Sequence, residues 1–252
     1  MTAKQTIEAG KAILGIEFGS TRIKAVLIDQ ENKPIAQGSH EWENQLVDGL
    51  WTYSIEAIWY GLQDCYAELR KDVQKQYDCE IESLAAIGFS AMMHGYMAFN
   101  EQQQILVPFR TWRNTNTGKA AAELSKLFNY NIPLRWSISH LYEAILDNEE
   151  HVADIKYLTT LAGYVHWQVT GQFVLGVGDA AHVAAAPLHV AAAARLPARP
   201  LALVHADQLP HACLAPSMEA PHACPQDFIV PSSIPRLQPF PLPTATGHGN
   251  IA

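Results

Sequence analysis

The order of strand-like and helix-like segments in this 252-residue sequence predicts an α/β domain with a mixed sheet flanked by helices. Two observations support the prediction. Residues 13–40 form three runs of alternating apolar and polar side chains, which is typical of an antiparallel meander. A long amphipathic helix, a short apolar strand and further helices follow the meander. The antiparallel start argues against a purely parallel sheet.

The first two strands are expected to form a hairpin around the turn Gly19-Ser20-Thr21. The turn is chemically unusual, because Glu17, two hydroxyl groups and Lys24 lie within eight residues. Backbone N–H groups in a glycine-led turn can converge on a phosphate, and hydroxyl groups add donors. Gly-Ser-Thr is also ordinary turn chemistry, and neither a Walker P-loop nor a GxGxxG pattern occurs. Spacing alone therefore leaves open a phosphate site and a plain polar turn.

Residues 34–40 predict a third strand, which is polar enough to lie near the edge of the sheet. From about residue 52, apolar side chains at helical spacing predict a long helix with Cys65 in its buried stripe. Residues 83–90 are almost wholly apolar and predict a central strand buried on both faces. The loop 91–95 follows this strand, at the end where open α/β sheets bind ligands.

The next segment predicts a hairpin of residues 96–99 and 105–112, followed by polar residues at the strand end. Three helices are then expected, over residues 117–128, 137–148 and 155–170, with Ser137 as an N-cap and Gly171 as a C-cap. A short strand over residues 173–177 is expected to end at Gly178-Asp179.

The composition argues against several classes of protein. The formal net charge of -8 gives no electrostatic basis for binding nucleic acid. No run of eighteen apolar residues occurs, and the N-terminus lacks the apolar core of a signal peptide, so no membrane partner is expected. The four cysteines form no CxxC pair, which favours a reduced, cytoplasmic protein.

The composition changes abruptly after about residue 180. Residues 181–252 contain no Lys, Trp or Tyr but hold twelve of the fifteen prolines. We therefore divide the chain into an N-terminal extension (1–11), one domain (12–180) and an Ala/Pro-rich tail (181–252) that is expected to be disordered. Pro-His-Ala-Cys occurs twice in the tail, and two His and two Cys can bind zinc. The spacing is not that of a standard zinc finger, so chance recurrence in a biased segment is the alternative.

Five segments resemble, in the same order, motifs of the FGGY carbohydrate kinases, and in particular their xylulokinase-like branch. They are GIEFGSTRIKAVLID, GFSAMMHGYM, TWRNTNT, YLTTLAGYVHWQVTG and GVGDA. The resemblance covers about residues 12–180, which is the bulk of that family's N-terminal domain. It implies a ribonuclease-H-like fold of the actin and hexokinase type.

The resemblance implies ATP-dependent phosphorylation of a sugar or polyol hydroxyl, with a pentulose such as xylulose or ribulose as the expected substrate. It implies ATP and Mg²⁺ as cofactors, with Glu17 as the metal-side carboxylate. Asp179 matches the catalytic base, which takes the proton of the attacking hydroxyl. The phosphate-binding positions are Gly19, Ser20, Thr21 and Lys24, and the sugar-binding positions are Met93, His94, Gly95, Trp112, Arg113 and Asn114.

The resemblance stops after Asp179-Ala180, where the family would continue with Ser-Gly and then a C-terminal domain. We hypothesise a truncation or a reading-frame shift, because the composition changes within a motif. Two alternatives to an active kinase follow, namely a non-catalytic remnant with weak sugar binding and an interaction protein acting through the Pro-rich tail. The expected partner is a small sugar, and a homodimer is left open.

Overall fold

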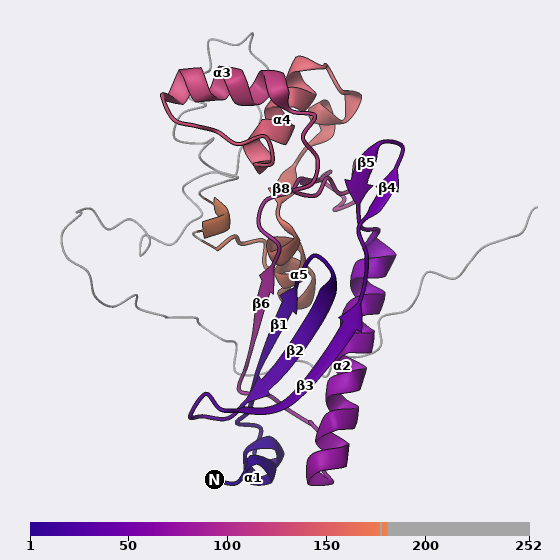
Figure 1. The fold of residues 1–252 in the computed structure, drawn as a ribbon, viewed down its shortest axis with the longest axis vertical. Helices are drawn as coiled ribbons and strands as arrows, with labels where there is room; N and C mark the ends of the chain where they lie inside the picture. The colour runs from indigo at the N-terminus through magenta and orange to yellow at the C-terminus, as the bar shows by residue number, and fades with distance from the viewer. Residues whose placement is uncertain (177, 181–252) are drawn as a thin grey trace, which may run out of the picture. The chain divides into compact units, whose positions relative to one another are not determined.

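The computed structural model describes residues 1–176 and 178–180 (Figure 1). The expected disorder of the tail and the two Pro-His-Ala-Cys segments therefore lie outside the described residues. No helix in the described part of the chain is both long and apolar enough to cross a membrane.

The main sheet has four strands, β1 (Ile13–Phe18), β2 (Arg22–Ile28), β3 (Pro34–Glu41) and β6 (Ala86–Ala91), in the order β3-β2-β1-β6. β1 pairs with β2, and β2 with β3, in antiparallel fashion, whereas β1 and β6 run parallel. The predicted meander and mixed sheet are confirmed. β3 lies at one edge, as its polar pattern predicted.

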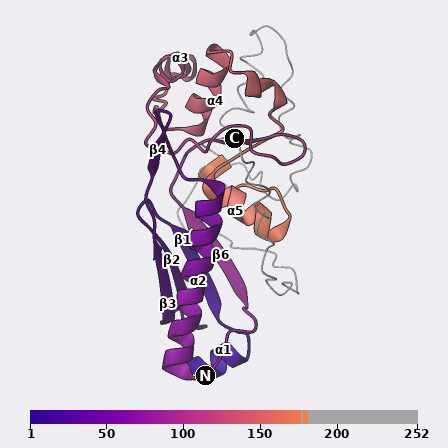
Figure 2. The ribbon, with the colours of Figure 1, turned by 90° about the vertical axis from the view of Figure 1, so that its right-hand side faces the viewer.

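Helix α2 (Ile55–Tyr77) runs alongside this sheet, roughly along its strands (Figures 1 and 2). It begins after Ser54, whose side chain accepts a hydrogen bond from the backbone N–H of Ala57, as an N-cap does. The helix approaches β3 so closely that a Cβ added at Gly38 would lie 2.3 Å from the carbonyl oxygen of Cys65. Cys65 is fully buried in the core, as predicted.

The expectation that β6 is a central strand buried on both faces is wrong for the described residues. β6 pairs with β1 alone and forms the second edge of the sheet. Its side chains are half buried or exposed. Four of its six residues are Ala, Gly or Ser, so the run is nonpolar in composition but offers little apolar area to bury.

A second, smaller sheet pairs β7 (Met97–Phe99) with β8 (Tyr157–Thr159) in antiparallel fashion. The predicted 96–112 hairpin is confirmed in part, because residues 105–112 contribute only two antiparallel bridges, Tyr96 with Arg110 and Phe99 with Ile105. The helix predicted over residues 155–170 is confirmed in part, because α5 begins later than predicted and spans Leu161–Thr170. It ends at Gly171, which has a φ of 73° and serves as the predicted C-cap.

The remaining elements are mostly short. α3 (Gly118–Phe128) and α4 (Ser137–Leu146) are confirmed, whereas residues 173–176 form no strand. The sequence did not predict α1 (Ala3–Glu8), the hairpin of β4 (Gln45–Val47) and β5 (Leu50–Thr52), or the 3-10 helix Glu150–Asp154. Ser137 is not the N-cap of α4, because Trp136 occupies that position and Ser137 lies inside the helix.

Candidate functional site

The expected phosphate turn and the expected sugar loop lie next to each other. The turn follows β1 and the loop follows β6, and these neighbouring strands run parallel, so both segments emerge at the same end of the sheet. A hydrogen bond of 2.9 Å from the Met92 N–H to the Phe18 carbonyl joins the two strand ends. Gly19 and Met93 are the next residues on either side.

The phosphate turn lines a hollow of about 370 Å³ together with flanking strand residues, namely Glu17, Gly19, Ser20, Thr21, Arg22 and Lys24. Ser20 and Thr21 are exposed. A Cβ added at Gly19 would lie 2.9 Å from the carbonyl oxygen of Arg22, so the tight turn favours glycine there. Glu17 and Lys24 face each other across the hairpin with Nζ and Oε2 3.9 Å apart.

Two buried aromatic residues, which were not predicted as site residues from the sequence, donate hydrogen bonds to the backbone of the turn. The indole Nε1 of Trp42 donates to the Gly19 carbonyl at 2.8 Å, and the Tyr53 hydroxyl donates to the Ser20 carbonyl at 2.6 Å. The Trp42 backbone N–H donates to the Thr21 carbonyl at 3.2 Å. Trp42 follows β3 and Tyr53 precedes α2, so no local sequence pattern relates them to the turn.

The sugar loop has an unusual backbone. His94 and Gly95 both have a positive φ, 68° and 91°. The buried Ser137 donates its hydroxyl hydrogen to the Gly95 carbonyl at 2.5 Å, and the Trp136 ring lies roughly parallel to the His94 ring with centroids 6.1 Å apart. The start of α4 thus supports the loop. The His94 side chain is nearly buried, whereas Met93 is 59% exposed.

The third predicted segment, Thr111–Asn114, is tied to β5. Asn114 accepts a hydrogen bond from the Trp51 N–H at 2.9 Å and donates to the Trp51 carbonyl at 2.8 Å. The guanidinium of Arg113 lies 3.5 Å from the centroid of the Trp51 ring. Trp112 remains 39% exposed. Trp112 and Arg113 are both exposed, whereas Asn114 is buried, and the contacts described for Asn114 and Arg113 support the loop itself.

A buried polar network lies under the sugar loop. Arg110 donates to both carboxylate oxygens of Glu149, and the Tyr96 hydroxyl is 2.7 Å from Nε2 of His151. Burial raises the pKa of Tyr96 and lowers that of His151. Burial, with the nearby Arg110 charge, lowers the pKa of His140 to about 3, and neither ring nitrogen of His140 has a hydrogen-bond partner among the described residues.

Asp179, the expected base, lies half buried in a helical turn over residues 178–180. The Ala180 N–H donates to the Gly176 carbonyl at 2.8 Å and anchors this turn. The assignment of Asp179 as the base still rests on the sequence resemblance alone.

The residues around the turn fit Mg²⁺ only in part. Among the described residues, no group of three or more His, Cys, Asp or Glu could hold a metal ion. Glu17 offers one carboxylate beside Lys24. Mg²⁺ commonly keeps several waters and is held by one or two carboxylates together with substrate phosphates, which matches a single carboxylate beside a phosphate site.

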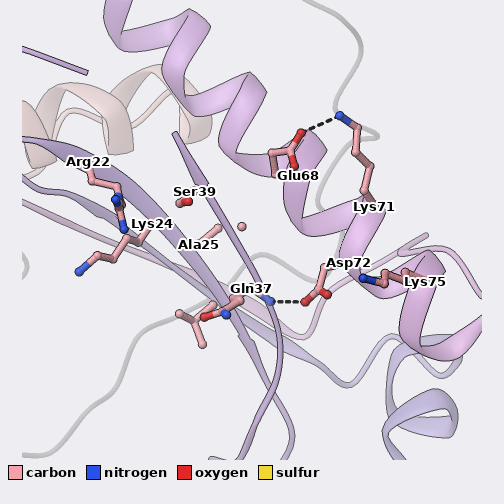
Figure 3. A pocket seen from close by; sticks show the side chains of 11 residues that line it. Arg22, Lys24, Ala25, Gln37, Ser39, Glu68, Lys71, Asp72 and Lys75 are labelled. Atoms are coloured by element: carbon pink, nitrogen blue, oxygen red, sulfur yellow. Dashed lines mark hydrogen bonds and ion pairs between the residues drawn. The ribbon is translucent and has the colours of Figure 1, made fainter. Parts of the chain in front are cut away.

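A second hollow, of about 510 Å³, is lined by residues of β2, β3 and α2 (Figure 3). It shares Arg22 and Lys24 with the phosphate hollow. Three of the four charged side chains on its α2 side have partners, because Glu68 pairs with Lys71 and Asp72 accepts a hydrogen bond from the Gln37 N–H (Figure 3). We assign no ligand to it.

Comparison with solved structures identifies the fold class. The chain superposes on xylulose kinase from Rhodospirillum rubrum with a TM-score of 0.59 at 15% identity, covering 69% of this chain and 37% of that one. The ligand-bound xylulose kinase from Lactobacillus acidophilus gives 0.57 at 21% identity, covering 69% and 36%. Plasmodium falciparum glycerol kinase with ADP gives 0.50 at 15% identity, covering 64% and 34%. The fold is that of the actin- and hexokinase-type sugar kinases, as predicted.

Comparison of sequences identifies the family. The model of the N-terminal domain of the FGGY family of carbohydrate kinases matches residues 12–190, which is more than half of the chain. The xylulose kinase of Escherichia coli K12 is 21% identical over 178 residues, which cover 67% of this chain and 35% of that protein. This chain belongs to the FGGY family of carbohydrate kinases, and it spans about a third of the length of the relatives it matches.

Proposed function

We propose that this chain carries the phosphate-binding and sugar-binding loops of an ATP-dependent carbohydrate kinase whose substrate is a pentulose such as xylulose or ribulose. The main support is the junction at Phe18 and Met92, which brings the two loops together at the ends of parallel strands. The named relatives include xylulose kinases, which supports the choice of a pentulose.

The residues supply the chemistry that this reaction needs. The imidazole of His94 can donate to and accept from sugar hydroxyls, and the exposed face of Trp112 can stack on the C–H face of a sugar. The N–H and hydroxyl groups of Ser20 and Thr21, with Lys24, neutralise phosphoryl oxygens. Glu17 would hold Mg²⁺ together with the nucleotide phosphates, and the ion would offset their negative charge. Asp179 is proposed as the base.

Sugar binding can be tested on the 252-residue chain by measuring its melting temperature with xylulose, ribulose, xylitol or glycerol. We expect a pentulose to raise the melting temperature of the wild type and of His166→Ala, a control on α5, but not that of His94→Ala. Any sugar-induced rise that survives His94→Ala would contradict the assigned sugar loop. No rise with any sugar would contradict the proposed function.

Phosphoryl transfer is a separate test, and it distinguishes a kinase from a non-catalytic remnant. The kinase proposal predicts pentulose-dependent ATP turnover that falls roughly 100-fold or more in Asp179→Asn, with Asp154→Asn as the matched control. We expect a low rate from the 252 residues alone, because they span about a third of their relatives, so the ratio of the wild-type rate to the Asp179→Asn rate is what separates a kinase from a remnant. Robust turnover that is insensitive to Asp179→Asn would remove Asp179 from the mechanism.

A further inference from the structure

We infer that Trp42 and Tyr53 are positioning residues of the phosphate turn. Their hydrogen bonds hold the carbonyl groups of the turn toward the protein interior, so that its N–H groups face a bound phosphate. The inference rests on the proposed function, in which this turn binds phosphate. It adds two residues from outside the turn that set the affinity of the turn for anions.

The first step concerns the carbonyl groups. Three consecutive carbonyls, those of Gly19, Ser20 and Thr21, all accept hydrogen bonds from this aromatic pair, at 2.8, 2.6 and 3.2 Å. A carbonyl oxygen carries partial negative charge and repels phosphate oxygens. Hydrogen bonding to the buried pair holds all three oxygens on the protein side of the turn.

The second step concerns the N–H groups. In a trans peptide unit the C=O and N–H bonds point in opposite directions, and the described chain has no cis peptide bond. Inward carbonyls at Gly19 and Ser20 therefore direct the N–H groups of Ser20 and Thr21 outward. Neither of these N–H groups donates a hydrogen bond within the described part of the chain. Two adjacent, unengaged N–H groups on an exposed turn form a concave anion site.

The third step concerns rigidity. The rings of Trp42 and Tyr53 stack with centroids 4.0 Å apart and planes 24° apart, and the Phe18 ring packs against Trp42 at 6.0 Å. Trp42 is 9% exposed and Tyr53 is 2% exposed. Well-packed side chains of this kind cannot follow a rotating peptide, so the turn is preorganised before a ligand arrives. Preorganised donors bind an anion more tightly than donors that must first reorient.

The chain supplies a matched control for the Tyr53 hydroxyl. Tyr77 is also partly buried, and its hydroxyl donates to a backbone carbonyl of the same sheet, that of Ile35 in β3, at 2.7 Å. Tyr53→Phe and Tyr77→Phe each delete one such hydrogen bond and keep the ring. Only Tyr53 contacts the phosphate turn, so a general loss of stability affects both variants and a positioning effect affects one.

The experiment is a titration of the ¹⁵N-labelled 252-residue chain with inorganic tripolyphosphate, monitored at the amide resonances of Ser20 and Thr21. We expect both amides to shift in the wild type, and the Kd to rise roughly three- to tenfold in Tyr53→Phe, which is the effect of one hydrogen bond. In Tyr77→Phe the Kd should stay within about twofold of the wild type. Trp42→Phe, which deletes the bond to Gly19, should weaken binding as Tyr53→Phe does.

The outcomes separate the inference from the proposed function. Equal Kd values in Tyr53→Phe, Tyr77→Phe and the wild type would overturn the inference and leave the phosphate turn in place. A wild type that does not bind tripolyphosphate would overturn both. Weaker binding in Tyr53→Phe and Trp42→Phe, at melting temperatures matching Tyr77→Phe, would support the positioning role.

Discussion

Two adjacent residues of the sugar loop, His94 and Gly95, adopt left-handed backbone conformations. A non-glycine residue pays for this conformation with strain of about 1–2 kcal/mol, so the surrounding contacts must hold His94 in place. Ser137 and Trp136 provide such contacts. At Gly95 glycine is also needed for space, because an added Cβ would lie 2.7 Å from Cε2 of Phe109.

Gly95→Ala is therefore expected to lower the free energy of unfolding by about 2–4 kcal/mol, from backbone strain plus overpacking. The measurement is urea denaturation of the full chain. Gly49→Ala is the matched control, because Gly49 also has a positive φ, of 80°, but has open space around it. We expect this control to lose about 1 kcal/mol. Equal losses in the two variants would show that contact with Phe109 costs nothing.

At the scale of single residues, some site positions could be predicted from the sequence and others could not. The turn Gly19-Ser20-Thr21 and the loop around His94 could be selected, because each follows a recognisable strand and matches a family motif. Ser137 was assigned to a local N-cap, but its partner is the Gly95 carbonyl, 42 residues earlier. A contact across that separation leaves no periodic signal in the chain.

At the scale of elements, α2 packs closely against β3, because Gly38 lets the helix backbone approach the strand. The buried residues Ile58, Cys65, Leu69 and Val73 repeat at helical spacing, which is why the sequence predicted this helix well. The three-residue strands β4, β5, β7 and β8 are too short to show alternation. Their pairing depends on partners elsewhere in the chain, so β4, β5 and β8 were missed.

We expect Gly38→Ala to destabilise the protein by about 3 kcal/mol or more, because its Cβ would lie 2.3 Å from the Cys65 oxygen and 2.4 Å from the Leu69 nitrogen. Both are backbone atoms, so α2 would have to move away from β3. Gly88→Ala in β6, which has open space around it, should change stability little. Chemical denaturation of both variants compares them, and a near-neutral Gly38→Ala would contradict this packing.

At the scale of the whole molecule, burial keeps one histidine, His140, in its neutral form over most of the acidic range. Burial lowers the pKa of His140 to about 3 and also lowers those of His151 and His166. The unfolded chain binds a proton at His140 near pH 6.5, whereas the native state does not until about pH 3. This stabilisation is complete above about pH 6.5 and is lost as the pH falls toward 3.

The stability of the wild type should therefore fall with decreasing pH below 6, and His140 should contribute a slope approaching about 1.4 kcal/mol per pH unit. His140→Leu should remove this contribution to the slope, because one protonation site is lost. At pH 7 its stability should match or exceed that of the wild type, because the variant removes two buried nitrogens that have no hydrogen-bond partner in the described part of the chain. Urea denaturation between pH 4 and 7 measures both effects, and an unchanged slope would contradict the assignment.

The prediction of the family rested on the order of five motifs, and the prediction of the mixed sheet rested on the order of strand-like and helix-like segments. The role of each site residue in the family's reaction stays a prediction. The residues that support the site could not be predicted, since Trp42, Tyr53 and Ser137 act through hydrogen bonds to backbone carbonyls that form in the folded state.

The two sets of supporting contacts lie far apart in the sequence, and this has a consequence for folding during synthesis on the ribosome. The phosphate turn and its aromatic pair lie within residues 18–53, and the helix that follows them, α2, ends at Tyr77. The sugar loop needs Ser137, which is made 60 residues after Tyr77. Contacts that are close in sequence form first as a chain emerges. The anion-binding half of the site can thus mature on the nascent chain while the half that selects the sugar is still being translated.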